Sequence, residues 1–403
     1  MESPLILTSD RYLTFPSPNW NFSDLLHAIF CSLIKKNSLE DLEKTIIEIF
    51  GPSHVMVTNL GRTALTIGLK AIGLERGAGV ILPGLICPTV IRAVLQAGCR
   101  PILVDVERNL HLSVKILSSC QEKAHAVIVP HLYGLSAPIQ EIREWSTRAG
   151  LYLIDDAAQA VGISIDGKYL GTFGDFGILS FGPFKSLSTP RGGALISENG
   201  DLVQKGKENI FPNEGIYWPI RRVLGSIIKF HLRPYYLRFN RKLNSRMVKS
   251  NNFNHELNQV GMAGEAFQLS NLEAQLVRSA LSRTASVITR RRRTAHEIWK
   301  LLKQFNKFEF VASDIPLHVK IPIRLHGGLT AEHAVRIFRS MNVEAEQIYY
   351  PLHLYREYAH FASQPLPMAE ENRKRVILIP NPGGESIFGI NRLEQAFKIL
   401  SKT

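Results

Sequence analysis

The chain has 403 residues, 45% of them hydrophobic, so it can bury a large core, and it is long enough for two domains. Its net charge of +13 favours an anionic partner such as a nucleotide diphosphate, acidic lipid or nucleic acid. The four cysteines form no C-x-x-C pair and have no histidine at metal-ligand spacing, which argues against a disulfide framework and a zinc site.

Targeting and membrane-spanning segments are not expected. Residues 1–16 lack the continuous apolar core of a signal peptide. No segment reaches the roughly 18 uninterrupted apolar residues that a spanning helix needs. We therefore expect a cytoplasmic protein in a reducing environment that is not integral to a membrane.

Helix-like and strand-like segments alternate along the first two hundred residues. Amphipathic helices are predicted over 38–50, 63–72 and 89–97. Short apolar strands are predicted over 55–57, 79–82, 101–104, 126–129, 151–154 and 178–181. This alternation indicates a mostly parallel sheet with helices on both faces.

The pattern changes after residue 260. A long basic helix is predicted over 272–305, followed by strands over 308–311 and 320–323 and helices over 331–341 and 391–400. We therefore expect a large α/β domain over residues 1–255 and a smaller α+β domain over 256–403.

An acid and a lysine follow two of the predicted strands. Asp155 and Asp156 end the strand that begins at residue 151, and Lys185 lies just beyond the strand 178–181. Open α/β sheets bind ligands at the carboxyl ends of their strands. Pyridoxal 5'-phosphate (PLP) needs a lysine to hold its aldehyde covalently and an aspartate to keep its ring nitrogen protonated. Because lysines are common and mostly solvated, this pair alone is weak evidence.

A candidate anion site lies at residues 59–65, which read N-L-G-R-T-A-L. A glycine turn opens directly onto a helix whose first amides and Thr63 hydroxyl can face a phosphate. Thr63 is equally compatible with an ordinary helix N-cap.

The surrounding residues make the assignment specific. The segments D-D-A-A-Q-A at 155–160, G-T-F-G-D at 171–175 and S-F-G-P-F-K at 180–185 resemble E-D-A-A-Q-A, G-T-F-G-D and F-S-F-x-P-x-K of the DegT/StrS family of PLP-dependent nucleotide-sugar aminotransferases. The resemblance covers residues 45–200 well and 262–400 loosely. It implies the fold-type I architecture, a mostly parallel sheet sandwiched by helices with a smaller α+β C-terminal domain.

The resemblance also implies roles for individual residues. Lys185 is the covalent partner of PLP and the proton carrier, and Asp156 is the partner of the ring nitrogen. Gln159 lies near the ring hydroxyl. The residues implied at the cofactor phosphate are Arg62, Thr63 and Ser180. No metal is expected.

Substrate contacts are implied by a second phrase. Residues 350–353 read Y-P-L-H, which is similar to the family's Y-P-x-P-L-H near the substrate. Tyr350 and His353 are therefore candidates for binding a sugar or assisting proton transfer, and packing on the core is an equally good reading of this aromatic strand end.

The chain departs from the family pattern at several positions. Arg62 replaces a glycine, and Cys87 stands where the family often has an aromatic residue stacked on the cofactor ring. Ser186 follows the lysine in place of asparagine. In the element that reaches across the family's dimer to the partner's phosphate, Ala266 and Gln268 replace asparagine and arginine. A homodimer is still expected, without the arginine that makes this contact in the family.

The resemblance implies transamination of a keto-sugar with an amino acid as donor, and glutamate is the donor expected from the family. A nucleotide-linked sugar for polysaccharide, glycoconjugate or secondary-metabolite biosynthesis is the first hypothesis. Lys185 supports transamination, because the resembling sugar dehydratases carry histidine at this position. One alternative is the same chemistry on a lipid-linked or non-sugar ketone at a membrane. The other is a non-catalytic dimeric binding or regulatory module.

Residues 216–255 form a basic insertion. Nine lysines and arginines lie between Glu214 and Glu256 without one acid, and apolar residues at 220, 223, 224, 227 and 228 follow helical spacing. This pattern fits a helix on an anionic membrane, and it also fits packing on the enzyme's own core with arginines that bind a diphosphate. The run Arg290–Arg293 lacks interleaved aromatic residues and is read as a solvated helix face, so no nucleic acid is expected as a partner.

Overall fold

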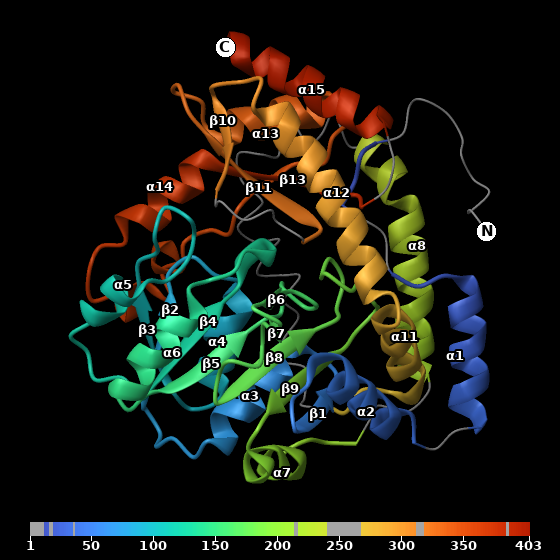
Figure 1. Cartoon of the computed structure of the whole chain (residues 1–403), viewed down its shortest axis with the longest axis vertical. Helices are drawn as coiled ribbons and strands as arrows, with labels where there is room; N and C mark the ends of the chain where they lie inside the picture. Colours follow the sequence, from blue (N-terminus) through green and yellow to red (C-terminus); the bar gives the residue numbers. More distant parts are fainter. Residues whose placement is uncertain are drawn as a thin grey trace.

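The computed structural model describes residues 12–15, 19–34, 37–212, 217–239, 267–311, 318–383 and 387–403. Figure 1 shows a large sheet domain below a smaller domain that contains the C-terminus. The predicted boundary at residue 255 lies outside the described residues and stays a prediction.

The large domain is built on a seven-stranded sheet of order β1-β9-β8-β5-β4-β2-β3. The strands are β1 (His54–Thr58), β2 (Gly79–Pro83), β3 (Arg100–Val104), β4 (Ala126–Pro130), β5 (Tyr152–Asp156), β8 (Phe176–Ser180) and β9 (Gly193–Ser197). The strand β9 runs antiparallel to both of its neighbours, β1 and β8, and the other pairings in the sheet are parallel. The central strands are buried on both faces, which explains why they read as uninterrupted apolar runs.

Helices cover both faces of this sheet. One side carries α3 (Gly61–Ala71), α4 (Pro88–Gln96) and α7 (Gly200–Glu208), and the other carries α2 (Ser38–Phe50), α6 (Ile139–Arg148) and α11 (Asn271–Leu281). Met56 packs into the first core, whereas Val55 and Val57 pack into the second, because successive strand residues point to opposite faces. Shorter elements complete the domain: α5 (Val114–Ser118), β6 (Ser164–Ile165) and β7 (Lys168–Tyr169).

The small domain has its own antiparallel sheet of order β10-β11-β13-β12. Its elements are α12 (Thr284–Leu302), β10 (Phe308–Phe310), β11 (Lys320–Leu325), α13 (Ala331–Ser340), β12 (Glu346–Gln347), α14 (Pro367–Arg375), β13 (Val376–Pro380) and α15 (Ile387–Lys402). A separate core forms here around Phe338 and Phe397.

The single helix predicted over 272–305 is wrong: α11 and α12 are separate helices. The break falls at Ser282 and Arg283. There the Arg283 guanidinium donates to the Asp24 carboxylate at 2.7 Å and to the carbonyl of Asn19 at 3.2 Å. These contacts hold the chain at the point where α11 ends.

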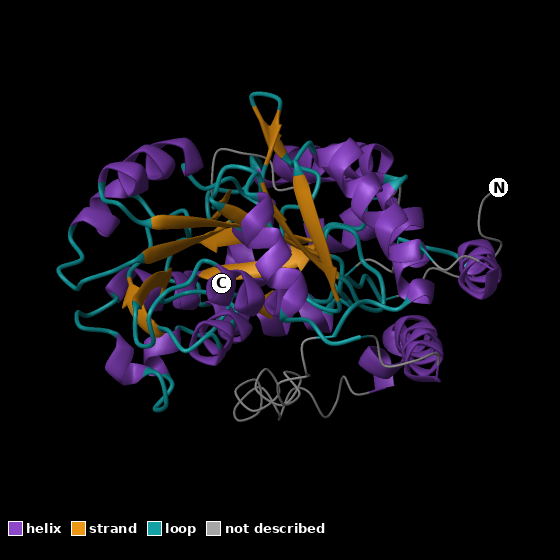
Figure 2. Cartoon of the chain, turned by 90° about the horizontal axis from the view of Figure 1, so that it is seen from below, coloured by secondary structure: helices purple, strands orange, loops and turns teal. Residues whose placement is uncertain are grey.

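Two further helices lie at one edge of the molecule. These are α1 (Phe22–Ile34), which the sequence pattern did not predict, and α8 (Tyr217–Phe239), which lies within the predicted basic insertion. They run side by side in Figure 1 and are seen end-on in Figure 2. A small core beneath them contains Leu25 and Ala28 of α1, Val223 of α8 and Leu276 of α11. Among the described residues, no helix is long and apolar enough to cross a membrane.

Candidate active site

A pocket of about 210 Å³ opens at the carboxyl ends of β4, β5 and β8, where the open-sheet rule places a ligand. It brings together six of the predicted residues: Arg62, Cys87, Asp156, Gln159, Ser180 and Lys185. Apolar side chains of Leu65, Ile86 and Val90 form part of its wall. A larger, more open hollow of about 860 Å³ beside α6 and α7 contains none of the predicted site residues.

The two neighbouring aspartates at the end of β5 have different surroundings. The Asp155 carboxylate accepts hydrogen bonds from the backbone amides of Gly171 and Phe173 and contacts His131 Nε2 at 2.8 Å. Because His131 Nδ1 accepts from the Ala137 amide, Nε2 carries the proton and donates to Asp155. Asp155 is therefore a structural acid, and Asp156 is the one that faces the pocket.

Asp156 lines the pocket and is only 7% exposed. Its Oδ1 accepts from the backbone amide of Ala158 at 3.0 Å. Burial raises the pKa of the Asp156 carboxyl, and the Ala158 amide and the positive charge of Lys185 act in the opposite direction. A hydrogen-bonded carboxylate beside a cation in a closed pocket suits a protonated ring nitrogen.

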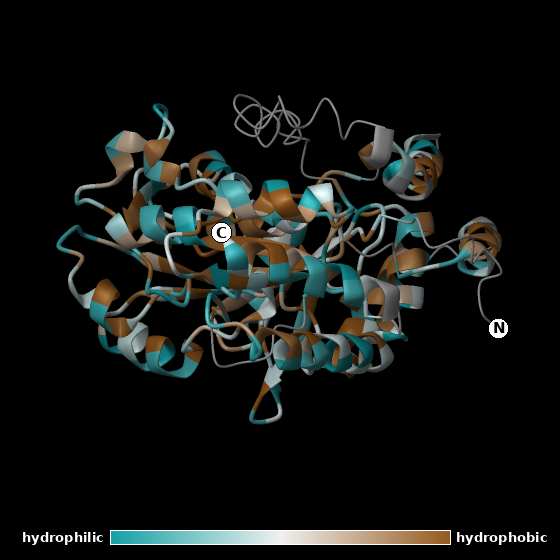
Figure 3. Ribbon diagram, turned by 90° about the horizontal axis from the view of Figure 1, so that it is seen from above, coloured by the Kyte–Doolittle hydropathy of each residue, from teal (hydrophilic) through white to brown (hydrophobic). Residues whose placement is uncertain are grey.

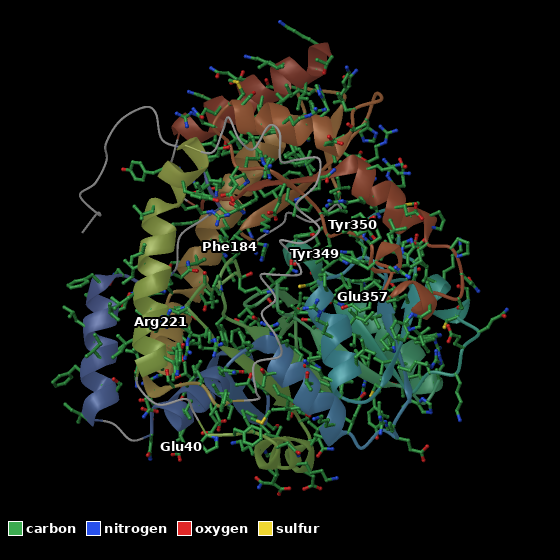
Figure 4. The ribbon with its side chains drawn as sticks, turned by 180° about the vertical axis from the view of Figure 1, so that it is seen from behind. Glu40, Phe184, Arg221, Tyr349, Tyr350 and Glu357 are labelled. Carbon is green, nitrogen blue, oxygen red and sulfur yellow. The ribbon has the colours of Figure 1, made fainter. Side chains whose placement is uncertain are left out.

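Lys185 follows β8 through a strained turn. Its amide donates to the Gly182 carbonyl at 3.3 Å, and Phe184 between them has a left-handed φ of 62°. The Phe184 ring lies beneath the guanidinium of Arg233 from α8, 4.6 Å from the ring centroid, and Figure 4 shows this ring between the two domains. The conformation that aims Lys185 into the pocket is therefore held by its own turn and by Arg233 of α8.

Desolvation in the pocket lowers the pKa of the Lys185 amine. The Asp156 carboxylate raises this pKa, and the charge of Lys320 lowers it further. The net direction is downward, so a larger fraction of the amine is uncharged and nucleophilic than for a lysine in water.

The amino end of α3 forms the opposite end of the pocket. Gly61 begins this helix, and a Cβ at Gly61 would lie 3.0 Å from Ser180 Cβ, so glycine allows the helix to approach β8. No side chain caps the helix at Leu60. Arg62 and Ser180 line the pocket here. Thr63 does not, and its hydroxyl donates to Asn59 Oδ1 at 2.7 Å.

Positive charge gathers at this end. Burial lowers the pKa of Arg62, and the nearby guanidinium groups of Arg191 and Arg92 lower it further. Three crowded cations beside an uncapped helix start make an environment that an anion stabilises.

The Gln159 side chain is held by both domains. Its Oε1 accepts from the Tyr133 amide at 3.0 Å, and its Nε2 donates to the Tyr349 hydroxyl at 2.9 Å. The rings of Tyr133 and Tyr349 are stacked with centroids 5.9 Å apart. The sequence patterns assigned no role to either tyrosine, although Tyr349 directly precedes the phrase Y-P-L-H.

His318 is a further residue, besides the two tyrosines, to which the sequence patterns assigned no role. It is 2% exposed, its Nδ1 accepts from the Lys320 amide, and its Nε2 has no hydrogen bond to any described residue. Its pKa is lowered well below its ordinary value by burial and by the charge of Lys185. Because His318 belongs to no recognisable motif, its position near Lys185 could not be predicted from the sequence.

Tyr350 and His353 do not line the pocket. The Tyr350 ring packs edge-on against Tyr355, and His353 Nε2 lies 3.2 Å from Glu370 Oε1. Both residues are only partly buried. Their predicted substrate contacts therefore stay predictions.

The donor set fits PLP. An amine and a carboxyl group share one pocket, apolar walls are available for a ring, and a helix start with arginine and serine can receive the phosphate. Cys87 lies in the wall of the pocket.

Comparisons with known proteins agree with this geometry. A sequence model of the DegT/DnrJ/EryC1/StrS aminotransferase family matches residues 28–383. The GDP-perosamine synthase of Caulobacter vibrioides is 24% identical over 365 residues, covering 88% of this chain and 87% of that protein. The GDP-perosamine synthase of Vibrio cholerae is 30% identical over 169 residues, which cover 41% of this chain and only 46% of that protein.

Solved structures share the fold at low sequence identity. The Helicobacter pylori aminotransferase PseC has a TM-score of 0.77 at 16% identity, covering 97% of this chain and all of that one (100%). The Escherichia coli GDP-4-keto-6-deoxy-D-mannose-3-dehydratase with bound hydrated PLP has a TM-score of 0.76 at 16% identity, covering 96% and 99%. The predicted fold class, an α/β fold-type I architecture, is confirmed.

Proposed function

Because the chain belongs to the DegT/DnrJ/EryC1/StrS aminotransferase family and is a PLP-dependent transaminase, we propose that it transfers an amino group from glutamate to a nucleotide-linked keto-sugar. The product would be an amino sugar for polysaccharide, glycoconjugate or secondary-metabolite biosynthesis. The observation that carries the proposal is the shared pocket of Lys185 and Asp156, an amine and an acid at the ends of adjacent strands.

The cofactor, when bound, supplies an electron sink for the bond broken at the amino-bearing carbon. Lys185 would hold it covalently and then carry a proton between the substrate carbon and the cofactor. Asp156 would keep the ring nitrogen protonated. Arg62, Ser180 and the start of α3 would hold the phosphate, with Gln159 beside the ring and Cys87 in the wall. Thr63, Tyr350 and His353 remain proposed contacts.

The proton carrier is suited to its task. A buried lysine with a lowered pKa alternates more readily between its charged and uncharged forms near neutral pH than a solvated lysine does. The apolar pocket wall keeps bulk water from competing for the proton.

We also propose that the active form is a homodimer in the cytoplasm. In this chain Gln268 occupies the position of the family's cross-subunit arginine, and its backbone amide donates to the Phe211 carbonyl at 2.9 Å. Arg62 supplies a cation beside the pocket from the same chain. Binding of the cofactor phosphate would therefore depend less on a positive charge contributed by the partner subunit.

A second candidate is the same transamination on a lipid-linked or non-sugar ketone at a membrane surface. One observation favours it: α8 exposes Leu224, Ile228 and Leu232, and its Arg233 also contacts Phe184 beside the active-site lysine. The non-catalytic alternative is disfavoured, because both members of the lysine and aspartate pair are retained in one pocket.

The test is a screen of keto-sugar nucleotides with glutamate, following 2-oxoglutarate and the amino sugar. Turnover on a nucleotide-linked ketone, absent in the Lys185→Ala variant, would support the first candidate. Turnover only on lipid-linked acceptors would support the second. A protein that binds no PLP under these conditions would point to the non-catalytic module.

A further inference from the structure

In the helix α8, charged side chains face the protein and apolar side chains face outward, which is the reverse of a surface helix in a water-soluble protein. Two of its arginines turn inward: Arg222 donates to Glu273 at 2.8 and 3.3 Å, and Arg233 donates to Glu344 at 3.3 Å through Nε and more closely through Nη2. The glutamates are nearly buried, at 1% and 7% exposed. A soluble helix instead turns its charged face to water.

The outward side of α8 is apolar. Ile220, Leu224, Ile228 and Leu232 follow one another at intervals of four residues and are 41–58% exposed. Residues four apart lie on one helix face, so these side chains form a continuous stripe, which we call the outer face of α8. The two inward ion pairs prevent the helix from rotating to bury it.

The helix α1 has the same arrangement. Phe22, Leu26, Phe30 and Ile34 are also spaced by four residues and are 53–71% exposed, and they form the outer face of α1. Its inward side packs in the small core shared with α8. Figure 3 shows both helices end-on at one edge of the molecule with hydrophobic residues along them. Two adjacent apolar stripes of this kind mark an interaction surface.

The residues around these stripes select an anionic, amphipathic partner. The single acid within α1, Asp24, is paired with Arg283, and Lys35 and Lys36 follow the helix in the sequence. The sequence between Glu214 and Glu256 has nine cations and no acid. Two of these cations, Arg222 and Arg233, are paired inward, whereas Arg221 is exposed beside Trp218. Exposed aromatic residues flank the outer face of α8: Trp218, Tyr235 and Tyr236. Apolar stripe, cations and aromatic ends are the features of a helix lying in the interface of an anionic bilayer.

A second copy of the chain fits this surface less well. A two-fold interface brings the same patch of both subunits together, so it would place cation-rich segments opposite each other. We propose that α1 and α8 together form a platform that lies on the surface of an anionic lipid bilayer. The platform goes beyond the transamination reaction and does not depend on which acceptor the enzyme uses.

Vesicle flotation of the full-length, PLP-loaded enzyme tests the platform. The vesicles contain equal parts of phosphatidylglycerol and phosphatidylcholine, or phosphatidylcholine alone. One variant carries Leu224→Gln, Ile228→Gln and Leu232→Gln, and another carries Leu26→Gln and Phe30→Gln; glutamine preserves helix propensity. The matched control carries Leu95→Gln and Ile399→Gln, two exposed apolar residues on α4 and α15.

We expect the wild type and the control to float with acidic vesicles at low salt and not with neutral ones, and we expect both platform variants to lose this binding. Failure of the wild type to float would overturn the proposal, as would flotation of both platform variants at the wild-type level. A platform variant whose mass in analytical ultracentrifugation falls to half that of the wild type would show that the face joins two copies instead.

A measurement on the unaltered platform guards against misfolded variants. Trp218 lies at one end of α8 and is 47% exposed, so it should be quenched by bromine-labelled acidic lipid. The Trp218→Phe variant should lose that component of the quenching. Quenching that is the same with and without Trp218 would contradict the platform. Amino-sugar formation measured without vesicles is a separate test of the proposed reaction.

Discussion

The hydroxyl of Tyr349 accepts a hydrogen bond of 2.9 Å from the side-chain amide of Gln159 in the large domain. Tyr349 itself follows the small-domain strand β12 in the sequence. Gln159 lines the candidate cofactor pocket, so this bond links the small domain to the pocket wall. Because Oε1 of the same amide accepts from the Tyr133 backbone, the orientation of Gln159 is fixed by two partners.

Tyr349→Phe should therefore weaken PLP binding and lower kcat moderately, by an amount equivalent to about 1 kcal/mol for the lost hydrogen bond. The phenyl ring would preserve the stacking on Tyr133. Equilibrium PLP binding and steady-state kinetics measure the two effects. Tyr152→Phe is the control, because this exposed tyrosine begins β5 and does not line the pocket, and equal losses in both variants would argue against a specific role for Tyr349.

Lys185→Ala should abolish turnover and the visible absorbance of lysine-bound cofactor while leaving the fold intact, since the side chain is both covalent partner and proton carrier. Absorbance spectra with borohydride reduction and circular dichroism check these outcomes. Lys185→Arg should be equally inactive, because a guanidinium retains charge but cannot replace the amine. A turnover-competent Lys185→Ala protein would refute the assignment.

The two adjacent aspartates should respond differently to the same substitution. Asp156→Asn should keep PLP bound but lose several orders of magnitude in kcat, because an amide cannot hold the ring proton. Asp155→Asn should lower the free energy of unfolding by about 2–4 kcal/mol. The Asp155 carboxylate now accepts hydrogen bonds from the backbone amides of Gly171 and Phe173, and an NH2 group in its place could not accept them. Chemical denaturation and kinetics separate the two. Similar behaviour of both variants would mean that the acids share one role.

The sequence could predict the parts of this site that depend on local pattern. Asp156 and Lys185 are at strand ends, and the strands are apolar runs because both faces of the sheet are covered. Tyr349 and His318 could not be predicted in the same way, since each reaches the large domain from a distant part of the chain. The Gln159 to Tyr349 contact spans 190 positions.

The insertion illustrates a different limit. Apolar periodicity predicted a helix near residues 220–228, but not which part of its stripe would be buried. In the structure Val223 is buried, whereas its neighbour Leu224 is 52% exposed. The Arg222 to Glu273 ion pair fixes this rotation, and its partner lies 51 positions away. The predicted cations at 241, 242, 246 and 249 lie outside the described residues.

Arg62→Ala should weaken PLP binding by about one to two orders of magnitude, since it removes a partly buried cation at the phosphate end of the pocket. Binding of pyridoxal, which lacks the phosphate, should be unchanged. Arg76→Ala provides an exposed control of the same chemistry. An equal loss for pyridoxal and its phosphate would mean that Arg62 supports the pocket and not the phosphate.

The pH dependence of PLP capture by cofactor-free enzyme should report the lowered pKa of Lys185. Only the uncharged amine attacks the aldehyde, so the capture rate should rise with pH to a midpoint below the ordinary lysine value of 10.5. Asp156 raises the pKa of Lys185 and Lys320 lowers it. Asp156→Asn should therefore move the midpoint to lower pH and Lys320→Met should move it to higher pH. Stopped-flow absorbance measures the rates, and shifts in the same direction for both variants would contradict this account of the pocket's electrostatics.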